Sequence, residues 1–298
     1  MLGKLMKYDM KYMARILPWL YLGGIGFSAL VTTFILVINN GTVLFLGAYA
    51  AYFLFLIAVE GIAVCSSIFM MVRIYRNMFS DEGYLTFTLP VKNGDVLNSK
   101  ILTGAIWTFL SGIVALIMIA LPIGAAIYKV PKLLEADDVS IGMMIESLIQ
   151  EFSVGLAGNE VKFIIFLVLT VVLIVISAFF APAFYSFCCA ITHKIKRARA
   201  FASVAIFIGV SYALGLIISI STVFIEIFSE YYMYGDEGFS AITPTAMIYD
   251  ASEMSAYFGM RLNIMIIDLL VVGTIMAVIT VVSWIVSNRI VNKKLNLL

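Results

Sequence analysis

Charged side chains are scarce in this sequence. They make up 12% of its 298 residues, about half the share found in soluble domains, whereas 63% of the residues are apolar. The mean hydropathy is +1.07, and a water-soluble fold could not bury that much apolar surface. The net charge of +1 lacks the concentrated basic excess of nucleic-acid-binding proteins. The composition therefore excludes a soluble domain and predicts a lipid bilayer, with no nucleic acid, as the partner.

Residues that carry chemistry are equally few. His193 is the single histidine, which excludes a histidine-rich metal site within the membrane. Cys65, Cys188 and Cys189 lie in apolar stretches, and we expect them to serve packing. No G-x-x-x-x-G-K-[ST] motif occurs, so the chain cannot bind ATP through a P-loop. We therefore predict no catalytic residue, no metal ligand and no cofactor on this chain, and a function that is not enzymatic.

Long apolar stretches are what the sequence has instead. Six of them reach roughly 20 residues or more, which is enough to cross a hydrocarbon core of about 30 Å. They cover residues 16–38, 43–72, 101–128, 163–190, 201–228 and 262–287. The second stretch is longer than a membrane requires, so we expect it to continue beyond the bilayer toward Arg73 and Arg76. The fold class predicted is all-α: a polytopic membrane protein with six transmembrane helices in a single domain, 1–298.

Lysine and arginine predict the orientation. Fifteen of the 19 fall in segments on one side of the six spans, and cytoplasmic segments are the ones that retain positive charge. Both termini are therefore predicted to be cytoplasmic, with residues 129–161 and 229–261 outside the cell. The tryptophans fall near predicted cytoplasmic ends of the spans, where an amphipathic ring suits the interface. They are Trp19, Trp107 and Trp284.

Residues 1–15 predict an interfacial amphipathic helix. Four basic residues recur every three or four positions and form one stripe, opposite an apolar face. A basic anchor that only fixes the topology is the alternative interpretation. Asp9 falls within the apolar face, where a lone carboxylate is costly, so we expect it to have a protein partner. The basic stripe is Lys4, Lys7, Lys11 and Arg15, and the apolar face includes Leu2, Leu5, Met6, Met13 and Ile16.

The most informative polar region is the cytoplasmic loop 73–100. Pro90 and the turn signal Asn93-Gly94 divide it into short pieces, and Asp95 is a candidate N-cap for the third span. Residues 84–91 are markedly apolar for a segment outside the membrane, and exposed apolar surface beside charge often marks a docking site. The alternative is that this segment simply packs under the helical bundle.

This loop resembles that of a known family. Glu82, then Leu89-Pro90-Val91, then Lys100 entering the third span resembles the ATPase-contacting loop of permease subunits in ABC transporters of the type-2 export family. The N-terminal sequence MLGKLMKYDMKYMARILPWLYL is similar to the start of small permeases of this kind in Gram-positive bacteria. The family often has arginine where this chain has Lys92-Asn93, and glycine where it has Ser99.

The resemblance implies a mechanism in the bacterial plasma membrane. Two permease subunits, identical or homologous, would form the pathway for an amphipathic substrate (a peptide, a lipid or a drug). Two separate cytoplasmic ATPase subunits would bind ATP and Mg and drive it. The resemblance also implies a re-entrant helical hairpin between helices 5 and 6, and a connecting helix whose Asp9 braces the loop against Arg73 or Arg76. The implied coupling residues are Asp81, Glu82, Gly83, Tyr84, Leu89, Pro90, Val91 and Lys92.

Two acids lie within predicted spans, where ionisable groups are functional candidates. Glu60 and Asp268 are expected at similar depths in the outer half of the membrane. In the structural interpretation Asp268 pairs with Arg261 and Glu60 bonds to hydroxyl groups. In the functional interpretation Glu60 faces the subunit interface and contacts a cationic or peptide substrate. A proton-coupled secondary transporter using both acids, or a membrane sensor or scaffold subunit, are the alternative functions.

The outer segment 129–161 contains a further candidate helix. Its apolar residues recur at helical spacing, so one face could cap the exit or dock on a partner. They are Ile141, Met144, Ile145, Leu148, Ile149 and Phe152.

Overall fold

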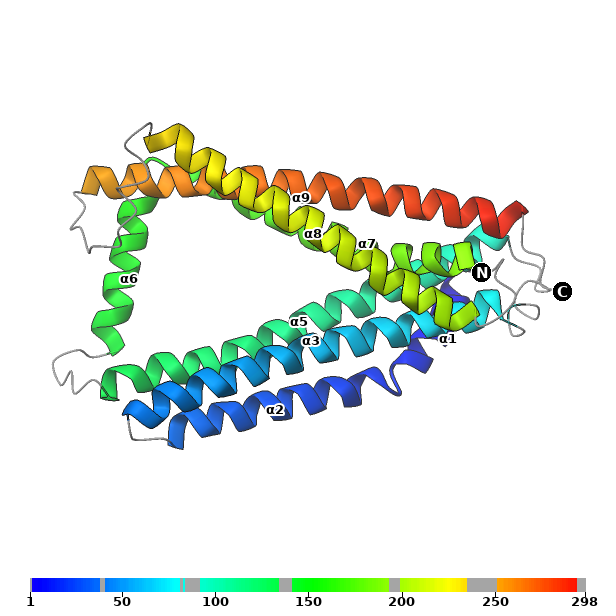
Figure 1. Cartoon of the computed structure of the whole chain (residues 1–298), viewed down its shortest axis with the longest axis horizontal. Helices are drawn as coiled ribbons and strands as arrows, with labels where there is room; N and C mark the ends of the chain where they lie inside the picture. Colours follow the sequence, from blue (N-terminus) through cyan, green and yellow to red (C-terminus); the bar gives the residue numbers. More distant parts are fainter. Residues whose placement is uncertain are drawn as a thin grey trace. The chain divides into compact units, whose positions relative to one another are not determined.

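The structure, a computed structural model, describes residues 2–37, 41–80, 83, 92–133, 141–192, 199–234 and 251–293. Over these residues the chain forms α-helices and no strand (Figure 1). The helices are α1 (Leu2–Met13), α2 (Leu17–Val37), α3 (Gly41–Phe79), α5 (Asn93–Leu133), α6 (Ile141–Leu156), α7 (Glu160–Thr192), α8 (Arg199–Tyr234) and α9 (Ala251–Lys293).

Six of these helices are long and apolar enough to cross a membrane, which confirms the six predicted spans. They are α2, α3, α5, α7, α8 and α9. As expected for the long second span, α3 continues past Arg73 and Arg76 to Phe79. The third span begins earlier than predicted, at Asn93. The prediction that Asp95 is the N-cap was wrong: its N–H already donates to the Lys92 carbonyl at 2.9 Å, so Asp95 lies in the first turn.

The helix predicted within residues 129–161 is confirmed as α6. Within residues 229–261, α8 extends to Tyr234 and α9 starts at Ala251. The centre of the predicted re-entrant hairpin, residues 235–250, lies outside the described residues.

The chain divides into two compact units. Unit 1 comprises Met1–Met143, Ala178–Ala205 and Thr280–Leu298, and unit 2 comprises Met144–Ser177 and Ile206–Ile279. Helices α7, α8 and α9 each contribute residues to both units.

Unit 1 is built around α2, α3 and α5, which pack against one another (Figure 1). Polar groups pin these helices together at two points: the Ser28 hydroxyl donates to the Met118 carbonyl at 2.7 Å, and Tyr21 and Ser111 share a hydrogen bond of 2.5 Å. Such bonds between helices stabilise bundles in lipid, where apolar burial alone gives little driving force. The apolar core contains Val31, Ile35, Phe55, Met118 and Ala125.

A close helix contact in unit 1 depends on glycine. A Cβ at Gly104 of α5 would lie 2.6 Å from the Cβ of Pro182 in α7. The pyrrolidine ring is fixed to its backbone and cannot rotate away, so a methyl group here must push the two helices apart.

We therefore expect Gly104→Ala to destabilise the protein by about 1 to 3 kcal/mol, the usual cost of overpacking. Gly112→Ala is the matched control, since it lies on the same helix with nothing within 4 Å of its added Cβ. Thermal unfolding of the two purified variants in detergent measures the difference. Equal melting temperatures would contradict the contact.

Unit 2 contains a polar junction between the α6–α7 turn and α9. The Asn159 amide donates to the backbone oxygen of Ser255 at 2.8 Å, and the Ser255 hydroxyl donates to the Ala157 carbonyl at 2.7 Å. A Cβ on Gly259 would lie 2.3 Å from Asn159 Oδ1, so a side chain there would displace the Asn159 amide from its hydrogen bonds. Phe152 packs edge-on against Phe258 beside this junction, at 5.7 Å between ring centroids. Together these contacts fasten α6 to the first turns of α9.

Candidate functional site

The strongest concentration of buried charge surrounds Asp9. This carboxylate is 2% exposed, and its Oδ2 accepts a hydrogen bond of 2.5 Å from the Lys100 ammonium. Its Oδ1 accepts from Arg73 Nη2 at 3.4 Å and from the Asn77 amide at 3.3 Å. Asp9 therefore has the protein partner that its place on the apolar face requires. We call Asp9, Arg73, Asn77 and Lys100 the Asp9 cluster.

Arg73 is held in this cluster by aromatic rings as well. Its guanidinium lies 3.8 Å from the centroid of the Tyr12 ring, and Tyr12 stacks on Phe69 at 6.1 Å with an angle of 6° between the planes. A cation over an aromatic face gains electrostatic stabilisation, more so where water is partly excluded. The side chain is 18% exposed, so water still reaches part of it.

The Asp9 cluster joins three helices. Asp9 lies on α1, Arg73 and Asn77 lie in the last two turns of α3, and Lys100 lies in the first turns of α5. The segment between α3 and α5 is the predicted coupling loop, so one buried carboxylate ties both of its flanks to α1. Because removing one partner of a buried ion pair is costly, this connection is firm.

The end of α9 holds the start of α5 from another side. Trp284 Nε1 donates to Asn98 Oδ1 at 2.9 Å, and a Cβ at Gly94 would lie 3.3 Å from Asn288 Oδ1. The helix ends that flank the loop are thus held by contacts with α1 and with the last turns of α9, all in unit 1.

Of the predicted coupling residues, the structure describes Gly83 and Lys92. The Gly83 N–H donates to the Ser80 carbonyl at 2.8 Å, and a Cβ there would lie 2.8 Å from the Met78 carbonyl oxygen, so a larger residue at this position would require the backbone to shift. Lys92 is exposed. The other six, Asp81, Glu82, Tyr84, Leu89, Pro90 and Val91, lie outside the described residues.

Two members of the Asp9 cluster were not expected from the sequence. Of the two arginines considered as partners, Arg73 bonds to Asp9, but Lys100 and Asn77 were not assigned to it. Lys100 was counted as a loop charge, yet it is 7% exposed. Lys100 lies seven residues after Asn93, which is about two turns inside α5. A correct prediction of the helix start at Asn93 would have placed Lys100 within the helix and not in the loop.

The interfacial role predicted for Trp107 was wrong. It is buried in unit 1 with its ring 6.4 Å from that of Tyr21, and its indole N–H has no hydrogen-bond partner among the described residues. Trp19, by contrast, is highly exposed, as an interfacial ring should be.

Glu60 points away from the core of unit 1. Phe55, Val59 and Ile62 of α3 face that core, whereas Glu60 is exposed. Over the described part of the chain no hydrogen bond or ion pair reaches it, so the hydroxyl partners considered for it are not found.

Asp268 of α9 has a different environment. Its Oδ1 is buried without a hydrogen-bond partner in the described chain. Arg261, the expected partner, directs its Nε to the Tyr257 hydroxyl at 3.1 Å.

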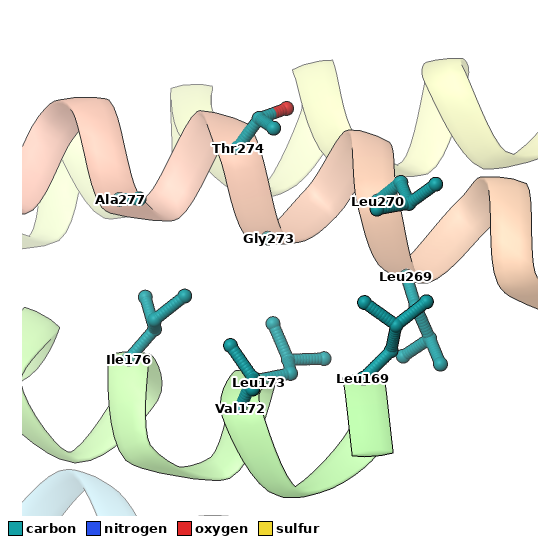
Figure 2. A pocket seen from close by; sticks show the side chains of 9 residues that line it. All are labelled: Leu169, Val172, Leu173, Ile176, Leu269, Leu270, Gly273, Thr274 and Ala277. Atoms are coloured by element: carbon teal, nitrogen blue, oxygen red, sulfur yellow. The ribbon is translucent and has the colours of Figure 1, made fainter. Parts of the chain in front are cut away.

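An apolar pocket lies between α7 and α9 within unit 2 (Figure 2). Its volume is about 170 Å³, and its walls are hydrocarbon apart from Thr274, whose hydroxyl donates to the Val271 carbonyl of its own helix. Figure 2 shows Leu169, Leu173 and Ile176 of α7 on one side and Leu269, Leu270 and Gly273 of α9 on the other. With no polar group left to direct a ligand, the pocket can accommodate apolar groups but cannot select among them.

No group of three or more histidine, cysteine or acidic side chains in the described ranges could hold a metal ion. Comparison of the chain with protein-family models, with curated protein sequences and with solved structures gave no match.

Proposed function

We propose that this chain is the permease subunit of an ATP-driven exporter of the ABC type-2 kind. The observation that carries the proposal is the Asp9 cluster: a buried carboxylate on an N-terminal helix connects the end of α3 and the start of α5, the two flanks of the apolar loop. A loop that receives force from an ATPase needs a base that transmits it to the membrane helices, and a buried ion network can supply one.

The apolar surface of α7, α8 and α9 supports a role in a larger assembly. Only 6% of the most apolar window of each is buried within the chain, compared with 28% for α2 and 22% for α3. Large apolar surfaces of this kind require lipid or another apolar protein against them. In the proposal a second permease, identical or homologous, covers part of this surface, and the two together form the pathway for an amphipathic substrate.

The mechanism is mechanical. Two cytoplasmic ATPase subunits bind ATP and Mg and approach each other, and the loop between α3 and α5 moves with them. Since Asp9 binds both flanks, this displacement would reach α1, α3 and α5 together. Pathway opening would then follow from movement of these helices as a group.

The proposal includes the topology. Both termini lie in the cytoplasm of a bacterial cell, and α1 lies at the inner membrane interface with Lys4, Lys7 and Lys11 exposed. The exposure of those lysines supports the interfacial placement, because the opposite face of α1 packs on α5.

One observation favours a second candidate, a proton-coupled transporter. A buried carboxylate oxygen without a hydrogen-bond partner, as at Asp268, suits a group that binds and releases a proton within the membrane. Proton-driven transport by the purified chain without any ATPase would establish it.

The test of the proposed function is reconstitution. Alone, the purified chain should hydrolyse no ATP; with the cognate cytoplasmic ATPase that the proposal requires it should form a detergent-stable complex that does. The same ATPase with an unrelated six-helix membrane protein is the control. If no cytoplasmic ATPase of the same organism binds the chain, or if the one that binds also binds equally to the control, the proposal is wrong.

A further inference from the structure

The exposed strip of α3 around Glu60 carries one charge in an otherwise apolar surface. Its immediate helical neighbours Leu56, Ile57 and Val64 are 40%, 55% and 47% exposed. Gly61 and Ala63 beside them are small and exposed, so another group can approach the carboxylate closely. Glu60 is the single charged residue between Gly41 and Val72 of α3.

Lipid alone is an unsuitable neighbour for this group. A carboxylate in the hydrocarbon region has neither water nor a hydrogen-bond donor, and such acids usually face a protein interior or an aqueous path and pair with a cation. No cation on α3 is close enough: Arg73 lies 13 residues further on, about 20 Å along the axis, and is engaged by Asp9.

A second copy of the same strip does not supply a positive partner for the Glu60 carboxylate. A two-fold interface places identical patches opposite each other, which brings one Glu60 toward the other. Two carboxylates in an apolar contact repel, unless a positive group lies between them. No cation among the described residues forms an ion pair with Glu60, so we look for its partner outside the chain.

We propose that Glu60 is the anionic anchor of a binding site for hydrophobic organic cations, compounds with one positive centre and a large apolar body. The inference rests on the proposed transport function and specifies its substrate class. Glu60 pairs with the positive centre, while Leu56, Ile57 and Val64 contact the apolar body. A hydrophobic anion of the same shape meets repulsion at the same place.

The experiment uses a matched pair of probes, tetraphenylphosphonium and tetraphenylborate, which are similar in shape and opposite in charge. Binding to the full-length chain in nanodiscs, without a membrane potential, is measured by equilibrium dialysis and corrected with empty nanodiscs. We expect Glu60→Gln to weaken binding of the cation at least tenfold and Glu60→Asp to retain most of it.

Asp268→Asn, which removes the other intramembrane acid, should bind the cation as the wild type does. Binding of the cation by Glu60→Gln at wild-type affinity overturns the inference, as does equal corrected binding of both probes by the wild type.

A second measurement needs no variant. Dicyclohexylcarbodiimide modifies carboxyl groups in apolar surroundings, and mass spectrometry quantifies the product at each residue. Tetraphenylphosphonium should protect Glu60 and leave the modification of Asp268 unchanged; unaltered modification of Glu60 overturns the inference. Neither measurement involves an ATPase, so a chain that binds its ATPase without Glu60-dependent cation binding refutes the substrate class alone. Glu60-dependent cation binding by a chain that binds no ATPase would refute the exporter and leave the cation site standing.

Discussion

Replacing Asp9 with alanine is expected to destabilise the protein by about 3 to 5 kcal/mol, the usual cost of leaving a buried charge without its partner. Lys100 is 7% exposed and would keep its ammonium group in unit 1 with no anion to bind. Arg73 is better placed to tolerate the change, because it is partly exposed and keeps the Tyr12 ring. Thermal unfolding of the purified variant in detergent measures the loss.

Variants of other residues in the Asp9 cluster, and of one exposed lysine, serve as controls for this prediction. Lys100→Met should cost less than Asp9→Ala, since Asp9 would still have Arg73 and Asn77. The double variant Asp9→Ala, Lys100→Met should recover much of the stability lost in Asp9→Ala, because the unpaired ammonium is gone. Lys92→Met, at an exposed position, should match the wild type. If Asp9→Ala is as stable as Lys92→Met, the cluster does not hold the helices.

Replacing Leu89 and Val91 together with aspartate is expected to abolish binding of the ATPase in the proposed exporter. The apolar loop residues are the proposed anchors of that interface, and two charges placed in a desolvated contact cost several kcal/mol. A loss of about 3 kcal/mol lowers the affinity by about a hundredfold, which is enough to eliminate co-purification. The readout is the amount of ATPase that remains with the tagged chain, together with its ATP hydrolysis.

Thr86→Asp, Thr88→Asp is the matched control, because it adds the same two charges at polar positions of the same segment. It should retain more ATPase than the Leu89, Val91 variant. Both variants should insert normally, since insertion depends on the apolar spans. Normal ATPase binding and transport by the Leu89→Asp, Val91→Asp variant would show that this loop is not the coupling element.

The six membrane spans could be predicted from the sequence because each is a long apolar run that suits few other structures. The need of Asp9 for a partner could also be predicted, since helical spacing places it among Leu5, Met6 and Met13. The identity of the partners could not: it depends on how α1 crosses α3 and α5, and nothing local to Lys100 distinguishes a loop lysine from a buried one. Trp107 was misassigned for a related reason, because α5 starts well before the apolar run, so the ring is deeper in unit 1 than hydropathy suggests.

For Glu60 and Asp268 too, one property could be predicted from the local sequence and another depends on tertiary contacts. Their place within apolar helices follows from the sequence alone. Whether each faces outward or inward depends on which side of its helix meets a neighbour. The outward direction of Glu60 became evident only once Phe55, Val59 and Ile62 were found to occupy the inner face.

The Asn159 junction limits how unit 2 can change conformation. Rotation of α9 about its own axis at Gly259 would bring a bulkier neighbour against Asn159 and break the bonds to Ser255. The α6 helix and the first turns of α9 are therefore expected to move together in the transport cycle that we propose. In the proposed exporter, whose topology places α6 outside the cell, a synthetic antibody fragment raised against α6 would restrain α9 as well and would arrest the cycle without contacting the proposed pathway.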